Sequence, residues 1–206
     1  MHCFAPRARA SIRGMGAAPA TASPLVRRYT LEEFFVLGLP PGHGHYELIA
    51  GVLYVVPPPT SRHDLVQSRL NMAFAAYAVA HPNDCVLFVP RSAIWTSAGT
   101  YLEPDLFLVS TERLREMGEG PRTTADLVVE ISSPGSAVYD RTAKADTYAA
   151  LGVRELWLVD LEQRAIERRI LAEGGWREAE QYTGPMRLES VVFPGLAVVP
   201  DEIFAS

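Results

Sequence analysis

One continuous stretch, residues 126–160, constrains the fold of this chain more than any other. It reads DLVVEISSPGSAVYDRTAKADTYAALGVRELWLVD: an apolar run, a Ser-Pro-Gly break, a segment with helical spacing and a second apolar run. Two short apolar runs joined by a helix are typical of parallel strands connected by a crossover. Gly152 stands where a helix from about Ser136 to Leu151 would end. The stretch therefore predicts a strand–helix–strand unit within a sheet.

The remaining segments add strands and helices around this unit. Thr30 and Glu33 form a capping-box pattern that predicts a short helix, and Ser61 is expected to cap a long one. The fold class we predict is α/β (α+β): a mixed central sheet flanked by helices, with an extra N-terminal strand pair and a C-terminal hairpin. We expect the strand pair in residues 46–59, turning at Ala50 and Gly51, strands in residues 84–97, 99–110, 124–133 and 153–163, the hairpin in residues 165–183, turning at Gly174 and Gly175, and an apolar tail (191–204) on the sheet.

Composition limits the class of protein. The 206 residues are 48% hydrophobic, enough for one core, and the net charge is −5. No run approaches the roughly 18 apolar residues that cross a bilayer. The two cysteines, Cys3 and Cys85, form no disulfide framework, so we expect a cytoplasmic protein with no membrane partner. Residues 1–28 are expected to be a disordered extension and residues 29–206 a single domain.

An acidic chain meets nucleic acid through a local basic patch. Arg113, Arg115 and Arg122 form a candidate patch in what reads as a loop, although a solvated loop is the alternative interpretation. His43 and His45 lie in a short HGH segment, but without further clustered His or Cys they are weak candidates for a transition-metal site.

Two carboxylates stand inside apolar strand-like runs. Asp105 follows a proline and precedes LFLV, and Glu130 lies in LVVEIS. A buried, unpaired carboxylate is costly, so each needs a cation, a hydrogen-bond network or a raised pKa. Neighbouring strands lie about 4.8 Å apart, so adjacent strands would bring both carboxylates to one hard ion such as Mg²⁺ or Mn²⁺. For either acid alone, an ordinary structural role stays open.

Asp140, Lys144 and Tyr148 recur at four-residue spacing and so share one helix face. If that face looks at the sheet, Lys144 could orient or help to deprotonate a water and stabilise charge that builds on a phosphate. The alternative is an ordinary surface pair between Asp140 and Lys144, worth about 0.3–0.5 kcal/mol.

The order PDL…VVEIS…D…K…Y…GVRELWLVD resembles the PD-(D/E)XK restriction-endonuclease-like superfamily, and within it the Uma-type endonuclease family. The resemblance runs from about Tyr29 to Phe204 and includes YELIAGVLYVVPPPTSRHDLVQSRL. It implies a restriction-endonuclease-like core and an Mg²⁺- or Mn²⁺-dependent endonuclease that cleaves DNA and leaves a 5′-phosphate.

The resemblance also implies roles for individual residues. Asp105 fills the Asp of the PD element and Glu130 the second acidic position, with the main-chain carbonyl of Ile131 as a further metal ligand. Ser132 stands where the superfamily has its lysine. In the Uma-like pattern the following helix supplies that lysine, which here is Lys144.

Further side chains are candidate supports of the same site. Glu47, in YELI, matches an additional acid of the family that completes the site or binds a second ion. Gln67 and His63, at the start of the long helix, could contact metal waters or a phosphate, or could be solvated polar residues of a helix end. Tyr148 matches the family helix, either as a hydrogen-bond partner of the site or as packing.

Two alternatives to a nuclease stay open. One is a non-cleaving module on the same fold that binds nucleic acid or a partner protein. The other is a structural network in which the acids pair with Lys144 and Arg141 and hold no metal. We also consider a homodimer, because two cuts in duplex DNA need two sites.

Overall fold

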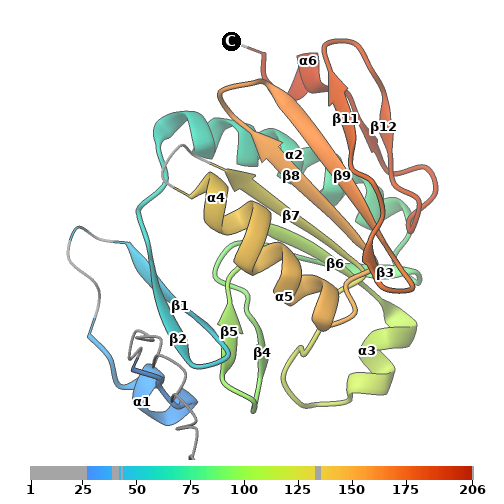
Figure 1. The fold of residues 1–206 in the computed structure, drawn as a ribbon. Helices are drawn as coiled ribbons and strands as arrows, with labels where there is room; N and C mark the ends of the chain where they lie inside the picture. The colour runs from blue at the N-terminus through green and yellow to red at the C-terminus, as the bar shows by residue number, and fades with distance from the viewer. Residues whose placement is uncertain (1–26, 39–41, 43, 133–135, 206) are drawn as a thin grey trace, which may run out of the picture.

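A mixed sheet of seven strands forms the centre of the computed structural model, which describes residues 27–38, 42, 44–132 and 136–205 (Figure 1). Its strand order is β10-β9-β8-β7-β6-β3, with β11 also paired to β9. β7 and β8 are parallel, which confirms the predicted strand–helix–strand unit. The strands are β3 (Cys85–Phe88), β6 (Leu106–Ser110), β7 (Leu127–Ser132), β8 (Glu155–Asp160), β9 (Ala165–Ala172), β10 (Gly175–Trp176) and β11 (Glu180–Thr183).

A second sheet, of order β2-β1-β5-β4, contains the predicted N-terminal strand pair. The pair turns at Ala50 and Gly51, whose φ angles are both positive. The strands predicted over 84–97 and 99–110 are wrong as single elements, because each is divided between the two sheets. Pro90 and Pro104 stand in the two breaks, and proline cannot donate to a strand ladder. The strands are β1 (His45–Ile49), β2 (Val52–Val56), β4 (Ile94–Thr96) and β5 (Thr100–Leu102).

Helices cover both faces of the larger sheet (Figure 1). α2 (Ser61–Ala80) lies on one face, and its N-cap is Thr60, whose side chain accepts from the His63 amide, so the expected Ser61 cap is wrong. On the other face lie α4 (Ala137–Tyr139), a π-helical turn (Asp140–Lys144) and α5 (Ala145–Ala150). The smaller elements are α1 (Leu31–Phe35), α3 (Thr111–Met117), β12 (Leu188–Glu189), β13 (Ala197–Val198) and α6 (Pro200–Ile203).

The segment with three arginines is a helix rather than the expected loop. Arg113 and Arg115 belong to α3, which Ser110 caps, and Arg122 follows it. Arg113 forms an ion pair with the buried Asp126, with 3.3 Å between Nε and Oδ1. This part of the predicted basic patch therefore serves the fold.

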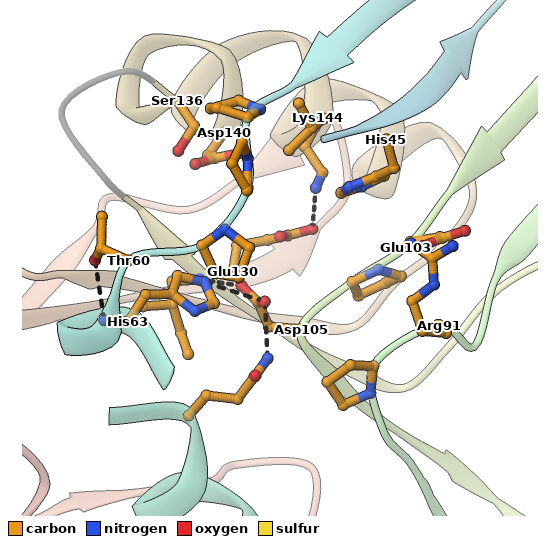
Figure 2. Close-up of a pocket in the computed structure, with 18 residues that line it drawn as sticks. His45, Thr60, His63, Arg91, Glu103, Asp105, Glu130, Ser136, Asp140 and Lys144 are labelled. Carbon is orange, nitrogen blue, oxygen red and sulfur yellow. Dashed lines mark hydrogen bonds and ion pairs between the residues drawn. The ribbon is translucent and has the colours of Figure 1, made fainter. Parts of the chain in front are cut away.

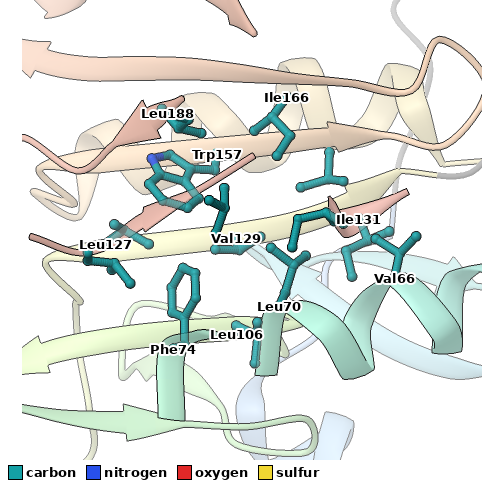
Figure 3. Close-up of a cluster of buried hydrophobic side chains, with 14 of the residues drawn as sticks. Val66, Leu70, Phe74, Leu106, Leu127, Val129, Ile131, Trp157, Ile166 and Leu188 are labelled. Atoms are coloured by element: carbon teal, nitrogen blue, oxygen red, sulfur yellow. The ribbon is translucent and has the colours of Figure 1, made fainter. Parts of the chain in front are cut away.

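The alternation of side chains along β7 separates two cores. Leu127, Val129 and Ile131 face α2 and pack with Leu70 and Phe74 (Figure 3). Val128 faces the opposite way, toward α5. Glu130 has the same parity as Val128, so its carboxylate also points at the α5 side. The apolar tail packs on the α2 side as expected, through Phe193, Leu196, Val198, Ile203 and Phe204.

The expected N-terminal extension is described only in its last two residues, Arg27 and Arg28. Residues 1–26 of the expected extension lie outside the described residues, whereas Arg28 donates to the carbonyl of Ala50.

Cys85 is buried in β3 as a free thiol. None of the helices in the described part of the chain has the length and apolarity that crossing a bilayer requires.

Candidate active site

A pocket of about 170 Å³ gathers most of the predicted site residues. Figure 2 shows Asp105 and Glu130 at its centre, with Thr60 and His63 from the start of α2 on one side and Arg91 on the other. The strand break before β6, the end of β7, the start of α2 and the π-helical turn all meet there. Of the predicted residues, Asp105, Glu130, Ile131, Lys144, Asp140, His63 and Gln67 line the pocket, while Glu47 and Tyr148 lie behind it.

The Asp105 carboxylate accepts a hydrogen bond from β7 that a neighbouring strand would otherwise accept. The pairing of β6 with β7 ends at Leu106 and Val129, so the Ile131 amide finds no backbone acceptor on that edge. Instead, Oδ2 of Asp105 accepts from the Ile131 N–H at 2.7 Å. Since the N–H and C=O of one strand residue point to the same edge, the Ile131 carbonyl shares the Asp105 side of β7.

The first helix holds Asp105 from the other side. Gln67 Nε2 donates to Oδ1 at 2.9 Å, and His63 Nε2 lies 3.2 Å from the same oxygen. Burial pushes the pKa of His63 down, but the neighbouring Asp105 carboxylate outweighs burial, so the pKa is raised. Both side chains thus contact the site through Asp105, and neither is a solvated helix-end residue.

Glu130 and Lys144 form a buried ion pair. The Lys144 Nζ lies 2.8 Å from Oε1 of Glu130, and both side chains are only 4% exposed. The Tyr148 hydroxyl donates to the same oxygen. The following helix thus brings its lysine to the second acidic position, as the Uma-like pattern implied, and burial of the helix face excludes an ordinary surface pair between Asp140 and Lys144.

Lys144 is the only lysine in the chain, and the other 18 of the 19 basic residues are arginine. An ammonium is a compact point charge on a flexible stem, whereas a guanidinium is broad and planar. The chain thus has its single compact ammonium in this pocket and a guanidinium at each of its other basic positions.

Glu47 holds Lys144 from behind. Its Oε1 lies 3.2 Å from the Lys144 Nζ and accepts from the Glu103 amide at 2.9 Å, while the Tyr139 hydroxyl donates to Oε2 at 2.9 Å. Burial alone would raise the pKa of Glu47, but Lys144, His45 and the hydrogen bond from the Glu103 amide lower it to about 2. Glu47 is therefore a permanent anion that fixes the lysine.

The pocket is lined by more carboxylates than lysine and arginine side chains. Burial raises the pKa of Glu130 well above its ordinary value, and Asp140, Asp105 and Glu47 act in the same direction against Lys144. Burial would lower the pKa of Lys144, but Glu130 and Glu47 outweigh it, so that pKa is raised. A cation that entered the pocket would relieve this repulsion among the carboxylates.

Asp140 and Arg141 have separate environments, although they are adjacent in the π-helical turn. Asp140 is 4% exposed and lines the pocket; burial raises its pKa, against the effect of Lys144. Arg141 points elsewhere and pairs with Asp160 and Glu167. In the structural alternative, the pairing of the site acids with Arg141 is therefore wrong, whereas their pairing with Lys144 is present.

The donor set fits a hard divalent ion. Asp105, Glu130 and the Ile131 carbonyl offer oxygen ligands at one pocket wall, and Mg²⁺ in proteins commonly takes only one or two carboxylates plus water. Oε1 of Glu130 is engaged, but in the described part of the chain its Oε2 has no hydrogen-bond donor. Among the described residues, no three His, Cys, Asp or Glu side chains are placed to hold a metal ion by themselves, so the Ile131 carbonyl and water would have to complete the coordination; His43 lies outside the described residues.

Some residues of the site were not predicted. Tyr139 precedes Asp140 and binds Glu47, yet nothing in its spacing distinguishes it from a packing tyrosine. Arg91 lines the pocket rim with a positive φ of 71°, a conformation that the sequence alone does not signal. His45 also lines the pocket, but with Nε2 at 3.9 Å from Glu47 Oε1 it faces an acid rather than a histidine cluster.

The chain is similar to known proteins in sequence and in fold. The family model Uma2, described as "Putative restriction endonuclease", matches residues 31–201. A crystal structure of "a putative nuclease belonging to DUF820 from Anabaena variabilis ATCC 29413" is similar, with a TM-score of 0.70 and 20% identity over 86% of this chain and 98% of that chain. At this identity the likeness shows a shared fold. No curated protein matches the chain in sequence.

Proposed function

This chain belongs to the Uma2 family of "putative restriction endonucleases", and we propose that it is an Mg²⁺- or Mn²⁺-dependent endonuclease that hydrolyses phosphodiester bonds of DNA. One observation carries the proposal: a carboxylate before β6, a carboxylate in β7 and the only lysine of the chain meet at one pocket. The restriction-endonuclease-like fold raises the expectation but does not by itself assign an activity.

The metal would be held by Asp105, Glu130 and the Ile131 carbonyl. A bound Mg²⁺ would act as a Lewis acid on the scissile phosphate and help to activate the attacking water. Gln67 and His63 keep the Asp105 carboxylate in place through its second oxygen.

Lys144 is the cation that the chain itself supplies to the reaction. Glu130 and Glu47 hold its ammonium at 2.8 and 3.2 Å, so its position is fixed before substrate arrives. A fixed positive charge stabilises the negative charge that builds on the phosphate oxygens in the transition state. Water adds to phosphorus and the bond to the 3′ oxygen breaks, which leaves a 5′-phosphate and a 3′-hydroxyl.

The test is a DNA-cleavage assay on the full chain. Cleavage is measured with Mg²⁺ or Mn²⁺, then with EDTA in place of the metal, and then in a variant that lacks the Lys144 ammonium. Lys144→Met keeps an unbranched side chain, one atom shorter, and removes its charge. We expect loss of cleavage by at least about 10²-fold, the usual cost of removing a preorganised electrostatic contact. Metal binding, measured by calorimetry, should persist because Asp105 and Glu130 are intact.

Arg187→Met is the matched control, since Arg187 is a 62%-exposed cation that does not line the pocket. The assigned role of Lys144 is refuted if Lys144→Met cleaves as fast as this control. Failure of the unchanged chain to bind Mn²⁺ would favour the non-cleaving module instead.

A further inference from the structure

The reactive groups of the pocket lie deep below the protein surface. Glu130 and Lys144 are each 3% exposed, and the Asp105 side chain is 18% exposed. A phosphate that reacts there has to enter the pocket, because hydrogen-bond contact requires a separation near 3 Å. A single strand bends freely and can bring a phosphate into such a recess, whereas a stiff duplex can do so only by a local distortion of its backbone.

The pocket is too small for a double helix. Its volume is about 170 Å³, close to the roughly 150 Å³ of an engineered cavity that holds one benzene molecule. This space suits a phosphate and part of its sugar. The rest of a duplex would have to lie outside the pocket, which requires its backbone to bend toward the site.

The walls favour contact with sugars and bases over a row of phosphates. Five prolines line the pocket, and proline has no N–H to donate to a phosphate oxygen and has a fixed φ. Three consecutive ones precede α2, and the others flank Arg91 and Asp105: Pro57, Pro58, Pro59, Pro90 and Pro104.

Permanent cations are few around the pocket. Lys144 and Arg91 are the lysine and arginine side chains among the described residues that line it. Arg91 stands at the rim, 70% exposed, with Nη1 3.2 Å from Oε2 of Glu103 (Figure 2). Proteins that grip duplex DNA commonly neutralise six to ten phosphates, whereas this site offers one exposed arginine on a chain of net charge −5.

From depth, volume, walls and charge together, we propose that the substrate of this pocket is an unpaired DNA strand rather than intact duplex, with Arg91 contacting a phosphate next to the scissile one. The inference rests on the proposed nuclease function and names its substrate. A duplex would first have to be distorted locally, an energetic cost that a flexible single strand does not meet.

Cleavage of three DNAs of one sequence tests the proposal in the full chain with Mn²⁺: a single strand, a fully paired duplex, and a duplex with a central unpaired bubble. We expect the single strand and the bubble to be cut at least about tenfold faster than the duplex, with cuts inside the bubble. Equal rates on the single strand and the duplex would overturn the proposal while leaving the nuclease function intact. If none of the three is cut, the nuclease function fails.

A binding measurement decides strand preference even in that case. Fluorescence anisotropy with Lys144→Met, which is expected not to cleave, should show tighter binding of the single strand than of the duplex by at least about tenfold. Equal affinity for both would refute the preference independently of catalysis.

The role of Arg91 has its own readout. Each phosphate contact to a single strand contributes about 0.7 to the slope of log K against log salt. Arg91→Ala should reduce that slope by about this amount, while Arg187→Ala should leave it unchanged. Identical slopes for the two variants would remove Arg91 from the DNA contact.

Discussion

The charge balance of the pocket predicts opposite stability effects for two neighbouring substitutions. Glu130→Gln removes one of four clustered carboxylates and keeps an oxygen that can accept from the Tyr148 hydroxyl. Lys144 stays paired with Glu47 at 3.2 Å, so no ammonium is left alone. We therefore expect the free energy of unfolding without metal to stay within about 1 kcal/mol of the parent or to rise, because repulsion among the carboxylates is relieved.

Lys144→Met has the contrary effect. It removes the ammonium that compensates Glu130 and Glu47, which are 3% and 0% exposed. Removing one partner of a buried ion pair typically costs about 3–5 kcal/mol, because the remaining charge is buried without compensation. The two variants should thus differ by at least about 2 kcal/mol in unfolding free energy.

Urea denaturation with EDTA at pH 7 measures both values through tryptophan fluorescence. Trp157 is fully buried, in edge-to-face contact with Phe74, and reports on the core. Equal m-values are required for the comparison. A loss of 3 kcal/mol or more in Glu130→Gln would refute the reasoning, since it would mean that the pair with Lys144 exists to stabilise the fold rather than to receive a cation.

Three further outcomes are expected. Asp105→Asn should weaken Mn²⁺ binding at least about tenfold by calorimetry, whereas Lys144→Met should bind it nearly as the parent does. Asp126→Asn, which disturbs a buried carboxylate that accepts from the Ser110 amide at 2.7 Å, should lower the unfolding free energy by about 1.5–3 kcal/mol and leave cleavage per folded molecule unchanged. Glu155→Gln should accelerate limited proteolysis near residues 190–192. One oxygen of Glu155 accepts hydrogen bonds from Ser190, Val191 and Val192, and an NH₂ group in its place cannot accept them.

The sequence was most informative where local rules and the fold agree. An apolar run that contains a carboxylate, followed by a turn and a helix, predicted the strand–helix–strand unit, and the resemblance to the Uma-type family then identified Lys144 as the lysine that joins Glu130. The end of that helix was also readable: Gly152 has a φ of 78°, a conformation that glycine adopts at little cost.

The sequence was least informative where long-range packing decides. Residues 99–110 read as one strand, yet the break at Pro104 sends the two halves to different sheets and leaves Asp105 free to cap the Ile131 amide. Arg91, in the segment before β4, reaches the pocket rim, and Tyr139, in α4, reaches Glu47 behind the pocket. Neither residue carries a local signal of its position.

The π-helical turn Asp140–Lys144 has a consequence at the level of the gene. Its hydrogen-bonded ring contains one residue more than that of an α-helical turn, and one residue is one codon. Losing a codon within this turn would let the helix close regularly and rotate the residues after it by about 100° relative to those before it. Such a deletion could leave both acids and the lysine in the reading frame and still separate them in space. For this chain, intact motif letters would therefore not be sufficient evidence of an intact site, and the length of this turn should be counted together with them.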